Sequence, residues 1–300
     1  MTNRKKPLQG VVPVLLSPLN ENREPDPEGI YRLVDFLVKA GVGGFWALGS
    51  ASEDINLSLA HRLTIARESA IANRGRVPLI LGTGLTAIDD ILNYFDAVAD
   101  LDLAGLHLLP FDVKMGESRL IHQITTLAER APVPLWLYHN PKRGRLINDQ
   151  VVAEVKRHPR VAGIKMGGYN LSELTTAMMH RDDDFDVIGA GGGQLYTMLC
   201  LGAEAHTTSE ASVIPEPFLE IFRLFQQGDR EGARKRQFDH IRFSKKIPRT
   251  DNGEYAAEEK YILALRGICT DQVNPLYRRL APEQQMVLRE LLREHGFEWA

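Results

Sequence analysis

The sequence predicts a (β/α)8 barrel, that is, eight parallel strands each followed by a helix, with a helical extension at its C-terminal end. Short apolar runs recur at intervals of roughly 20 to 35 residues, and each is followed by a segment with helical spacing. The runs are apolar along their whole length, as is typical of parallel strands buried between helices. Eight such units suit closure into a barrel, and an open doubly wound sheet is the alternative.

The candidate strands span, in chain order, residues 10–16, 44–48, 78–82, 105–109, 134–138, 161–165, 185–188 and 205–208. Between them, the segments 26–40, 59–73 and 117–130 place apolar residues three and four apart, which predicts amphipathic helices. The first of these segments opens on Asp26-Pro27, a helix-start signal.

Helical patterns continue after the eighth unit. They cover residues 218–227, 230–246, 255–267 and 282–294, with breaks at 248–253 and 270–275. One barrel repeat requires less helix than this. We therefore predict two parts, a catalytic barrel over residues 1–227 and a helical extension over residues 228–300.

The composition excludes several classes of partner. With 300 residues, 44% of them hydrophobic, the chain can form one large core. A formal net charge of -3 with evenly mixed signs provides no basic surface for nucleic acid. No apolar run reaches the ~18 residues of a membrane span, so we expect no membrane partner.

The cysteine content indicates where the protein works. Cys200 and Cys269 are far apart and lack metal-binding or redox spacing, so no disulfide framework is expected. No apolar signal segment follows the basic opening residues. A cytoplasmic location follows from both observations.

Reactive groups in a parallel barrel come from the carboxyl ends of the strands and the loops after them. Those positions are 17–18, 49–53, 82–84, 110–112, 138–141, 165–168, 189–193 and 209–212. They contain a lysine, a tyrosine, a hydroxyl beside glycine and several glycine-rich turns, whose N–H groups can hold an anion.

Lys165 lies in a run of apolar and small residues, Val161-Ala-Gly-Ile-Lys-Met-Gly-Gly168. Burial disfavours the charged ammonium, and a neutral amine can attack a carbonyl to form a Schiff base. The alternative is a strand-end lysine whose ammonium reaches water. Tyr138 ends the preceding strand and would face the same mouth, where a phenol can relay protons. Its alternative is a core aromatic with its hydroxyl at the rim.

Three segments in this order, Gly49-Ser-Ala-Ser-Glu53, Leu137-Tyr-His-Asn-Pro141 and Gly163-Ile-Lys165, resemble the dihydrodipicolinate synthase/N-acetylneuraminate lyase family of class I aldolases. The resemblance covers nearly the whole chain, from Gly10 to the C-terminal helices, including the stretch 202–215. It implies a barrel with a three-helix extension, usually a tetramer, whose lysine forms a Schiff base with pyruvate or another 2-oxo acid.

The resemblance assigns roles to individual residues. Lys165 matches the Schiff-base lysine, and Tyr138 matches the tyrosine that moves protons at the imine. Ser50 matches the first hydroxyl of the family's Gly-Thr/Ser-Thr-Gly-Glu loop, and the N–H groups of Ser50 and Ala51 would hold the carboxylate of the 2-oxo acid. Arg143 falls where the synthases bind the carboxylate of the second substrate, although a solvated basic cluster also explains it.

The glycine run Gly189-Ala-Gly-Gly-Gly193 follows the seventh strand and opens a helix over residues 195–201. In the family this stretch contacts the distal part of the substrate, so we expect Gly191 and Gly192 to leave space and free N–H groups there. Such a turn in a barrel can also hold a phosphate, which keeps a phosphosugar substrate open.

Several departures from the family pattern argue against a dihydrodipicolinate synthase itself. Ala51 replaces the second hydroxyl of the loop, and Ser52 replaces its glycine. Where the synthases carry paired tyrosines after the fourth strand, this chain has Phe111 and Asp112. A carboxylate cannot replace a phenol as a donor unless its pKa is raised.

These observations predict a Schiff-base lyase or aldolase, active in cleavage, condensation or dehydration of pyruvate or a longer 2-oxo acid such as a 2-keto-3-deoxy sugar acid. We expect no cofactor beyond the covalent imine through Lys165, and no metal, since nine histidines show no ligand spacing. The partners expected are a small 2-oxo acid and further copies of the chain, as a dimer or tetramer. The alternatives are a dihydrodipicolinate synthase and a non-catalytic 2-oxo acid binding protein.

Overall fold

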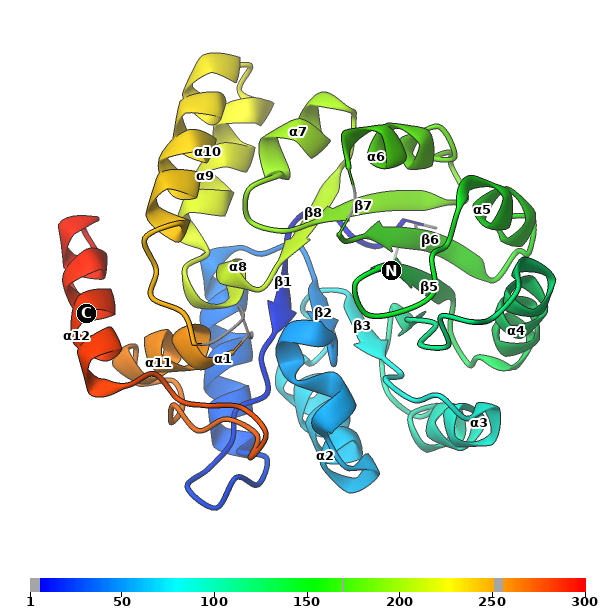
Figure 1. The fold of residues 1–300 in the computed structure, drawn as a ribbon, viewed down its shortest axis with the longest axis horizontal. Coiled ribbons are helices and arrows are strands. Elements are labelled where there is room, and N and C mark those ends of the chain that lie inside the picture. The colour runs from blue at the N-terminus through cyan, green and yellow to red at the C-terminus, as the bar shows by residue number, and fades with distance from the viewer. Residues whose placement is uncertain (1–5, 169, 251–255) are drawn as a thin grey trace.

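In a computed structural model, which describes residues 6–168, 170–250 and 256–300, eight parallel strands close into a barrel surrounded by helices (Figure 1). The strands are β1 (Gly10–Leu15), β2 (Phe45–Ala47), β3 (Leu79–Gly82), β4 (Gly105–Leu108), β5 (Leu135–His139), β6 (Val161–Met166), β7 (Asp186–Ala190) and β8 (Ala205–Thr208). The ring closes where β1 pairs with β8. The predicted barrel is therefore confirmed, and the open sheet was the wrong alternative.

Helices alternate with the strands and cover the outside of the barrel (Figure 1). They are α1 (Pro27–Ala40), α2 (Leu59–Asn73), α3 (Ile88–Ala97), α4 (Glu117–Arg130), α5 (Asp149–Val155), α6 (Leu171–Met178), α7 (Leu195–Cys200), α8 (Glu210–Val213) and α9 (Glu216–Gln226). Two short 3-10 helices, η1 (Ser50–Ser52) and η2 (Asp54–Asn56), follow β2. The apolar faces of the amphipathic helices pack on the strands, because burial of these faces supplies most of a helix's stability in a protein.

The extension consists of α10 (Arg230–Ser244), α11 (Ala257–Leu265) and α12 (Pro282–Glu294), which lie to one side of the barrel (Figure 1). The predicted division at residues 227/228 falls in the turn between α9 and α10, which pack on each other. The division into two parts stays a prediction. The second helix of the extension was expected to start at Tyr255, which lies outside the described residues.

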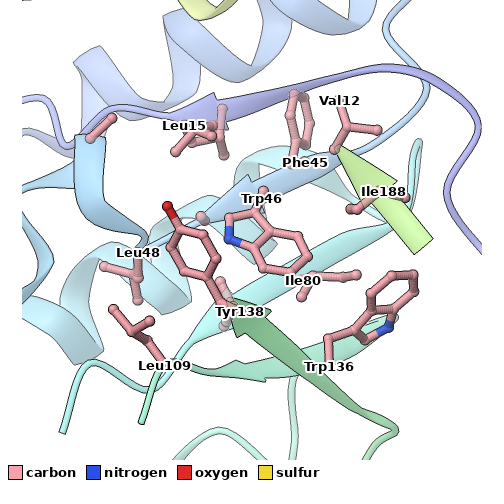
Figure 2. Close-up of a cluster of buried hydrophobic side chains, with 14 of the residues drawn as sticks. Val12, Leu15, Phe45, Trp46, Leu48, Ile80, Leu109, Trp136, Tyr138 and Ile188 are labelled. Atoms are coloured by element: carbon pink, nitrogen blue, oxygen red, sulfur yellow. The ribbon is translucent and has the colours of Figure 1, made fainter. Parts of the chain in front are cut away.

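The interior of the barrel is filled by large side chains from neighbouring strands (Figure 2). Trp46 on β2 lies edge-on to Trp136 and Tyr138 of β5, with ring centroids 6.1 and 6.2 Å apart. Such contacts add ~1 kcal/mol each to the gain from burying the rings themselves. The rings make a rigid floor below the carboxyl ends of the strands.

Register places the two predicted reactive side chains together. On β5 and β6, Tyr138 pairs directly with Lys165. Paired residues on neighbouring parallel strands point to the same face of the sheet, so both side chains face the same end of the barrel interior. This agrees with the expectation drawn from the strand ends.

Across the described parts of the chain, the structure contains no helix that combines the length and apolar character needed to cross a membrane.

Candidate active site

A cavity of about 530 Å³ opens at the carboxyl ends of the strands. All seven residues predicted for the site line it, namely Ser50, Ala51, Tyr138, Arg143, Lys165, Gly191 and Gly192. They come from the loops after β2, β5 and β7 and from β5 and β6 themselves. Their shared position shows that residues far apart in sequence are brought to one mouth.

Lys165 is buried, with 2% of its surface exposed. Its Nζ lies 4.8 Å from the centre of the Trp46 ring and 4.5 Å from that of Tyr138. Burial lowers the pKa of Lys165 from 10.5 to about 7, while the charge of Asp54 raises it and that of Arg143 lowers it. A large fraction of this amine is therefore neutral at physiological pH.

The hydroxyl of Tyr138 belongs to a polar chain at the mouth. The Ser50 hydroxyl donates to it over 3.4 Å, and the Asn140 side-chain amide donates over 3.2 Å. Donors aimed at a phenol oxygen stabilise its phenolate form, which a proton relay passes through. Asn140 was not among the predicted site residues, although it stands two positions after Tyr138.

Arg143 is held by a carboxylate inside the site. Its Nη2 lies 2.9 Å from Oδ1 of buried Asp54, and its Nη1 also donates to the Ser50 hydroxyl. Asp54 was missed from the sequence because it lies one residue past the motif, beside Glu53. Placement of Arg143 at the cavity agrees with a binding role, whereas its pairing with Asp54 shows that the guanidinium already has a partner in the chain.

The loop after β2 is held in an uncommon backbone conformation. Leu48 and Glu53, on either side of it, have positive φ values of 55° and 60°. Ser52 donates its hydroxyl to the carbonyl of Leu15 and accepts from the N–H of Gly49. The serine that departs from the family pattern thus fixes the loop to β1 through its side chain.

A buried ion pair supports the same loop from below. The Lys260 Nζ, on α11, lies 3.1 Å from Glu53 Oε1, and both side chains are buried. Lys260 also donates to the carbonyls of Ser17 and Gln272. These contacts compensate the ammonium, since a buried charge is tolerated only when it is paired and hydrogen-bonded.

The residues in place of the family's paired tyrosines lie at the edge of this site. Phe111 packs 5.9 Å from the Arg143 guanidinium, measured to the ring centre. Asp112 is exposed, accepts from the N–H of Lys114 and lines a different cavity. Asp112 is therefore not among the described residues that line the cavity with Lys165 and Tyr138.

The part of the cavity beyond the glycine turn carries charged side chains that the sequence did not predict. Glu210, Arg249 and Glu259 line it together with Gly191 and Gly192. The Glu210 carboxyl group packs against the glycine turn, and a Cβ added to Gly192 would lie only 2.9 Å from it. One sequence signal was available, the charged run Glu258-Glu259-Lys260 at the start of a helix whose other residues are mostly apolar.

Two histidines near the site are uncharged. Burial lowers the pKa of His206 to about 4 and that of His107 well below its usual value. His206 shares a hydrogen bond with the Gly191 carbonyl over 2.8 Å, and His107 stacks on Trp46. Nowhere in the described ranges do three His, Cys, Asp or Glu side chains gather as a metal site requires; metal-free catalysis stays a prediction.

Comparison with known proteins decides the family. A sequence model of the dihydrodipicolinate synthetase family matches residues 7–294. The chain belongs to this family. Its members are class I aldolases and lyases, so the chain is a lyase of the class I aldolase type.

The similar proteins are named for two activities. The 4-hydroxy-tetrahydrodipicolinate synthase of Methanospirillum hungatei is 30% identical over 237 residues, which cover 77% of this chain and 81% of that protein. The N-acetylneuraminate lyase structure from Proteus mirabilis has a TM-score of 0.88 at 22% identity, with 97% of this chain and 100% of that chain covered. The dihydrodipicolinate synthase structure from Bacteroides thetaiotaomicron gives 0.90 at 24% identity, with 96% and 99% covered. These structural likenesses show the shared fold.

Proposed function

We propose that the protein is a Schiff-base lyase in which Lys165 condenses with the keto carbon of pyruvate or of a longer 2-oxo acid. The observation that supports this most is the buried Lys165 amine, whose pKa of about 7 accompanies direct contact with the Tyr138 ring at the floor of an open cavity. An amine that is neutral at working pH is the form that attacks a carbonyl.

In the proposed reaction, the Lys165 nitrogen bonds to the keto carbon and the keto oxygen takes a proton from Tyr138. Loss of water from this carbinolamine leaves a protonated imine. In a carbon–carbon cleavage, the Tyr138 phenolate takes the proton of the hydroxyl on the leaving fragment while the electron pair of the breaking bond moves to the imine, giving an enamine and a carbonyl product. In a carbon–oxygen cleavage, a proton leaves the carbon next to the imine to give the enamine, which then expels the protonated hydroxyl group as water and becomes a conjugated imine. Protonation of the enamine in the first case, and hydrolysis of the imine in both, release the 2-oxo product and restore Lys165. Each proton transfer needs a group that gains and loses a proton in place, and Tyr138, with Ser50 as its donor, occupies that position.

The carboxylate of the 2-oxo acid would bind at the loop after β2. The N–H groups of Ser50 and Ala51 open η1, and the first N–H groups of a helix have no partner within it. Both residues line the cavity with Lys165. Ala51 contributes no hydroxyl, so this subsite relies on backbone donors.

The second candidate is a dihydrodipicolinate synthase, which would condense the pyruvate enamine with aspartate semialdehyde. Its support is the relatives of that name and Arg143 at the cavity. Against it stand the Asp54 partner of Arg143 and the position of Asp112 outside the cavity. Absence of turnover with that pair of substrates would remove it.

A borohydride trap tests the first candidate. We expect pyruvate and borohydride to add the mass of one reduced adduct at Lys165, located by peptide mass spectrometry. Lys165→Ala should form none and lose turnover of every 2-oxo acid in a panel. An active Lys165→Ala variant would refute imine catalysis, and an adduct without turnover of any panel member would favour a binding protein instead.

The resemblance is also the basis for proposing a homo-oligomer, either a dimer or a tetramer, in the cytoplasm. Light scattering on the purified chain distinguishes these states from a monomer.

A further inference from the structure

Glu259 is a carboxylic acid that the proposed imine chemistry does not use. It lies in the first turns of α11, is 4% exposed, and lines the cavity that contains Lys165. Its Oε2 is buried without a hydrogen-bond partner among the described residues. A buried polar atom that lacks a partner is costly, and such an atom beside a cavity has room for a ligand group to satisfy it.

Each carboxyl group near Glu259 lies beside a basic side chain, while Oε2 of Glu210 and of Glu258, like that of Glu259, accepts no hydrogen bond from the described residues. Glu210, from α8, lies 2.7 Å from His240 Nε2 on α10. Glu258 accepts from Arg249, which precedes α11. Glu259 is left with a hydrogen bond from the Ser209 side chain and with two like charges nearby. Burial, followed by the charge of Glu258, raises its pKa to about 8, so the carboxyl group is largely neutral at neutral pH.

A neutral carboxyl group both donates and accepts hydrogen bonds, which suits a hydroxyl group better than an anion. The glycine turn beside it has no side chains at Gly191 and Gly192, so a substrate chain could extend past the turn. Pyruvate ends at a methyl group and has nothing for such an acid to bind. A polar group in this place therefore serves the part of a longer substrate beyond its keto carbon.

We propose that Glu259 binds a hydroxyl group on the distal chain of the substrate and thereby selects hydroxylated 2-oxo acids over unsubstituted ones. The inference rests on the proposed imine function and adds the residue that determines specificity, supplied by the C-terminal extension rather than by a strand end. It accounts for a carboxylic acid that is buried at the cavity and has no ion-pair partner among the described residues.

The test uses three probes with the full-length protein: pyruvate, 2-oxohexanoate and 2-keto-3-deoxygluconate. The last two have the same chain length and differ in their hydroxyl groups. The readout is the concentration of each probe that half-saturates the borohydride-trapped adduct at Lys165. Wild-type protein should prefer 2-keto-3-deoxygluconate to 2-oxohexanoate. Glu259→Leu should reduce that preference by ~10-fold or more, with pyruvate unchanged.

Two further variants separate binding from a structural role. Glu259→Gln keeps a neutral donor and acceptor, so it should retain most of the preference. Glu258→Gln changes the neighbouring residue, which does not line the cavity, and should retain the preference at low pH; because the Glu258 charge raises the Glu259 pKa, the ionisation of Glu259 should then begin at a lower pH than in the wild type. An equal loss for all three probes in Glu259→Leu, or an unchanged preference, would overturn the inference.

A pH series with the wild type and Glu259→Gln tests the proposal even if Glu259→Leu folds poorly. As the wild-type carboxyl group ionises above about pH 8, it stops donating and only accepts hydrogen bonds, so the preference for the hydroxylated probe should change there, whereas that of Glu259→Gln should stay constant. Identical pH profiles would contradict the proposal. Absence of any wild-type adduct with pyruvate would instead refute the imine function, so the two failures are distinguishable.

Discussion

The two ends of the cavity are built differently. Near Lys165 the side chains come from strand ends and the loop after β2, whereas near Glu259 they come from α8, α11 and the segment before α11. Burial is the largest cause of the altered pKa in both places, and it favours the neutral form of a base at one end and of an acid at the other. One physical effect thus favours a neutral amine and a neutral carboxylic acid within the same cavity.

From this difference we expect the two ends of the cavity to have separate roles, one in the reaction at the keto carbon and one in binding the distal part of the substrate. Strand ends are rigid because the barrel fixes them, which suits the keto-carbon chemistry that we propose. The extension packs beside the barrel, so we expect changes of its cavity-lining residue Glu259 to affect that chemistry less than changes at the strand ends. If this comparison is correct, changes near Lys165 should affect every substrate, and changes near Glu259 should affect long ones.

Tyr138→Phe should produce the largest change. Removal of the phenol hydroxyl leaves the Lys165 amine and its aromatic surroundings in place but removes the proposed proton relay. We expect kcat to fall by ~10²- to 10⁴-fold for every substrate, short or long. Steady-state kinetics with a short and a long 2-oxo acid measure this, and a loss confined to the long one would contradict these separate roles.

Lys165→Met should change how stability depends on pH. Burial lowers the lysine pKa from 10.5 to about 7, so between these values the unfolded chain binds a proton that the folded chain lacks. Stability of the wild type should therefore rise with pH, by ~2 kcal/mol more than that of Lys165→Met between about pH 6 and about pH 9. Urea unfolding of both proteins measures the difference. Glu259 contributes equally to the pH dependence of the stability of both proteins, so its contribution cancels in the difference.

Asp54→Asn should shift the pH profile of imine formation. The Asp54 charge raises the pKa of Lys165, so its removal should move the midpoint of borohydride trapping to lower pH and speed trapping a few-fold below the wild-type midpoint. Glu259→Gln, at the other end, should leave that midpoint unchanged. An unshifted Asp54→Asn profile would show that Asp54 does not control the amine.

Gly192→Ala should have the smallest effect. The added methyl group would lie 2.9 Å from the Glu210 carboxyl group, so either that side chain moves or the space beyond the turn narrows. We expect a few-fold weaker binding of a long 2-oxo acid and no change with pyruvate. Gly193→Ala is the matched control, because its methyl group would have its nearest neighbour at 3.6 Å.

Much of the fold and of the end of the cavity near Lys165 could be predicted from the sequence. Apolar runs and helical spacing are local signals, and the resemblance depends on short motifs that contain Ser50, Tyr138 and Lys165. The order of the strands then determines which of these residues meet.

The end near Glu259 could not be predicted in the same way. Glu259 reaches the cavity because α11 folds back against α8 and the barrel, a contact between distant segments that leaves no periodic signal. The pairing of Arg143 with Asp54 likewise depends on the exact course of two loops. Burial of Glu258 and Glu259 contradicts the usual expectation that a charged pair on a helix faces water.

The ion pair between Lys260 and Glu53 has a consequence for recombination within this family. A chimera that joined this barrel to the extension of a relative without that lysine would bury an unpaired carboxylate beneath the loop after β2, and the reciprocal chimera would bury an unpaired ammonium. Either mismatch should cost several kcal/mol. Crossovers near the turn between α9 and α10 would therefore succeed only between parents that share both charges, so the loop and the distant helix are expected to be inherited together.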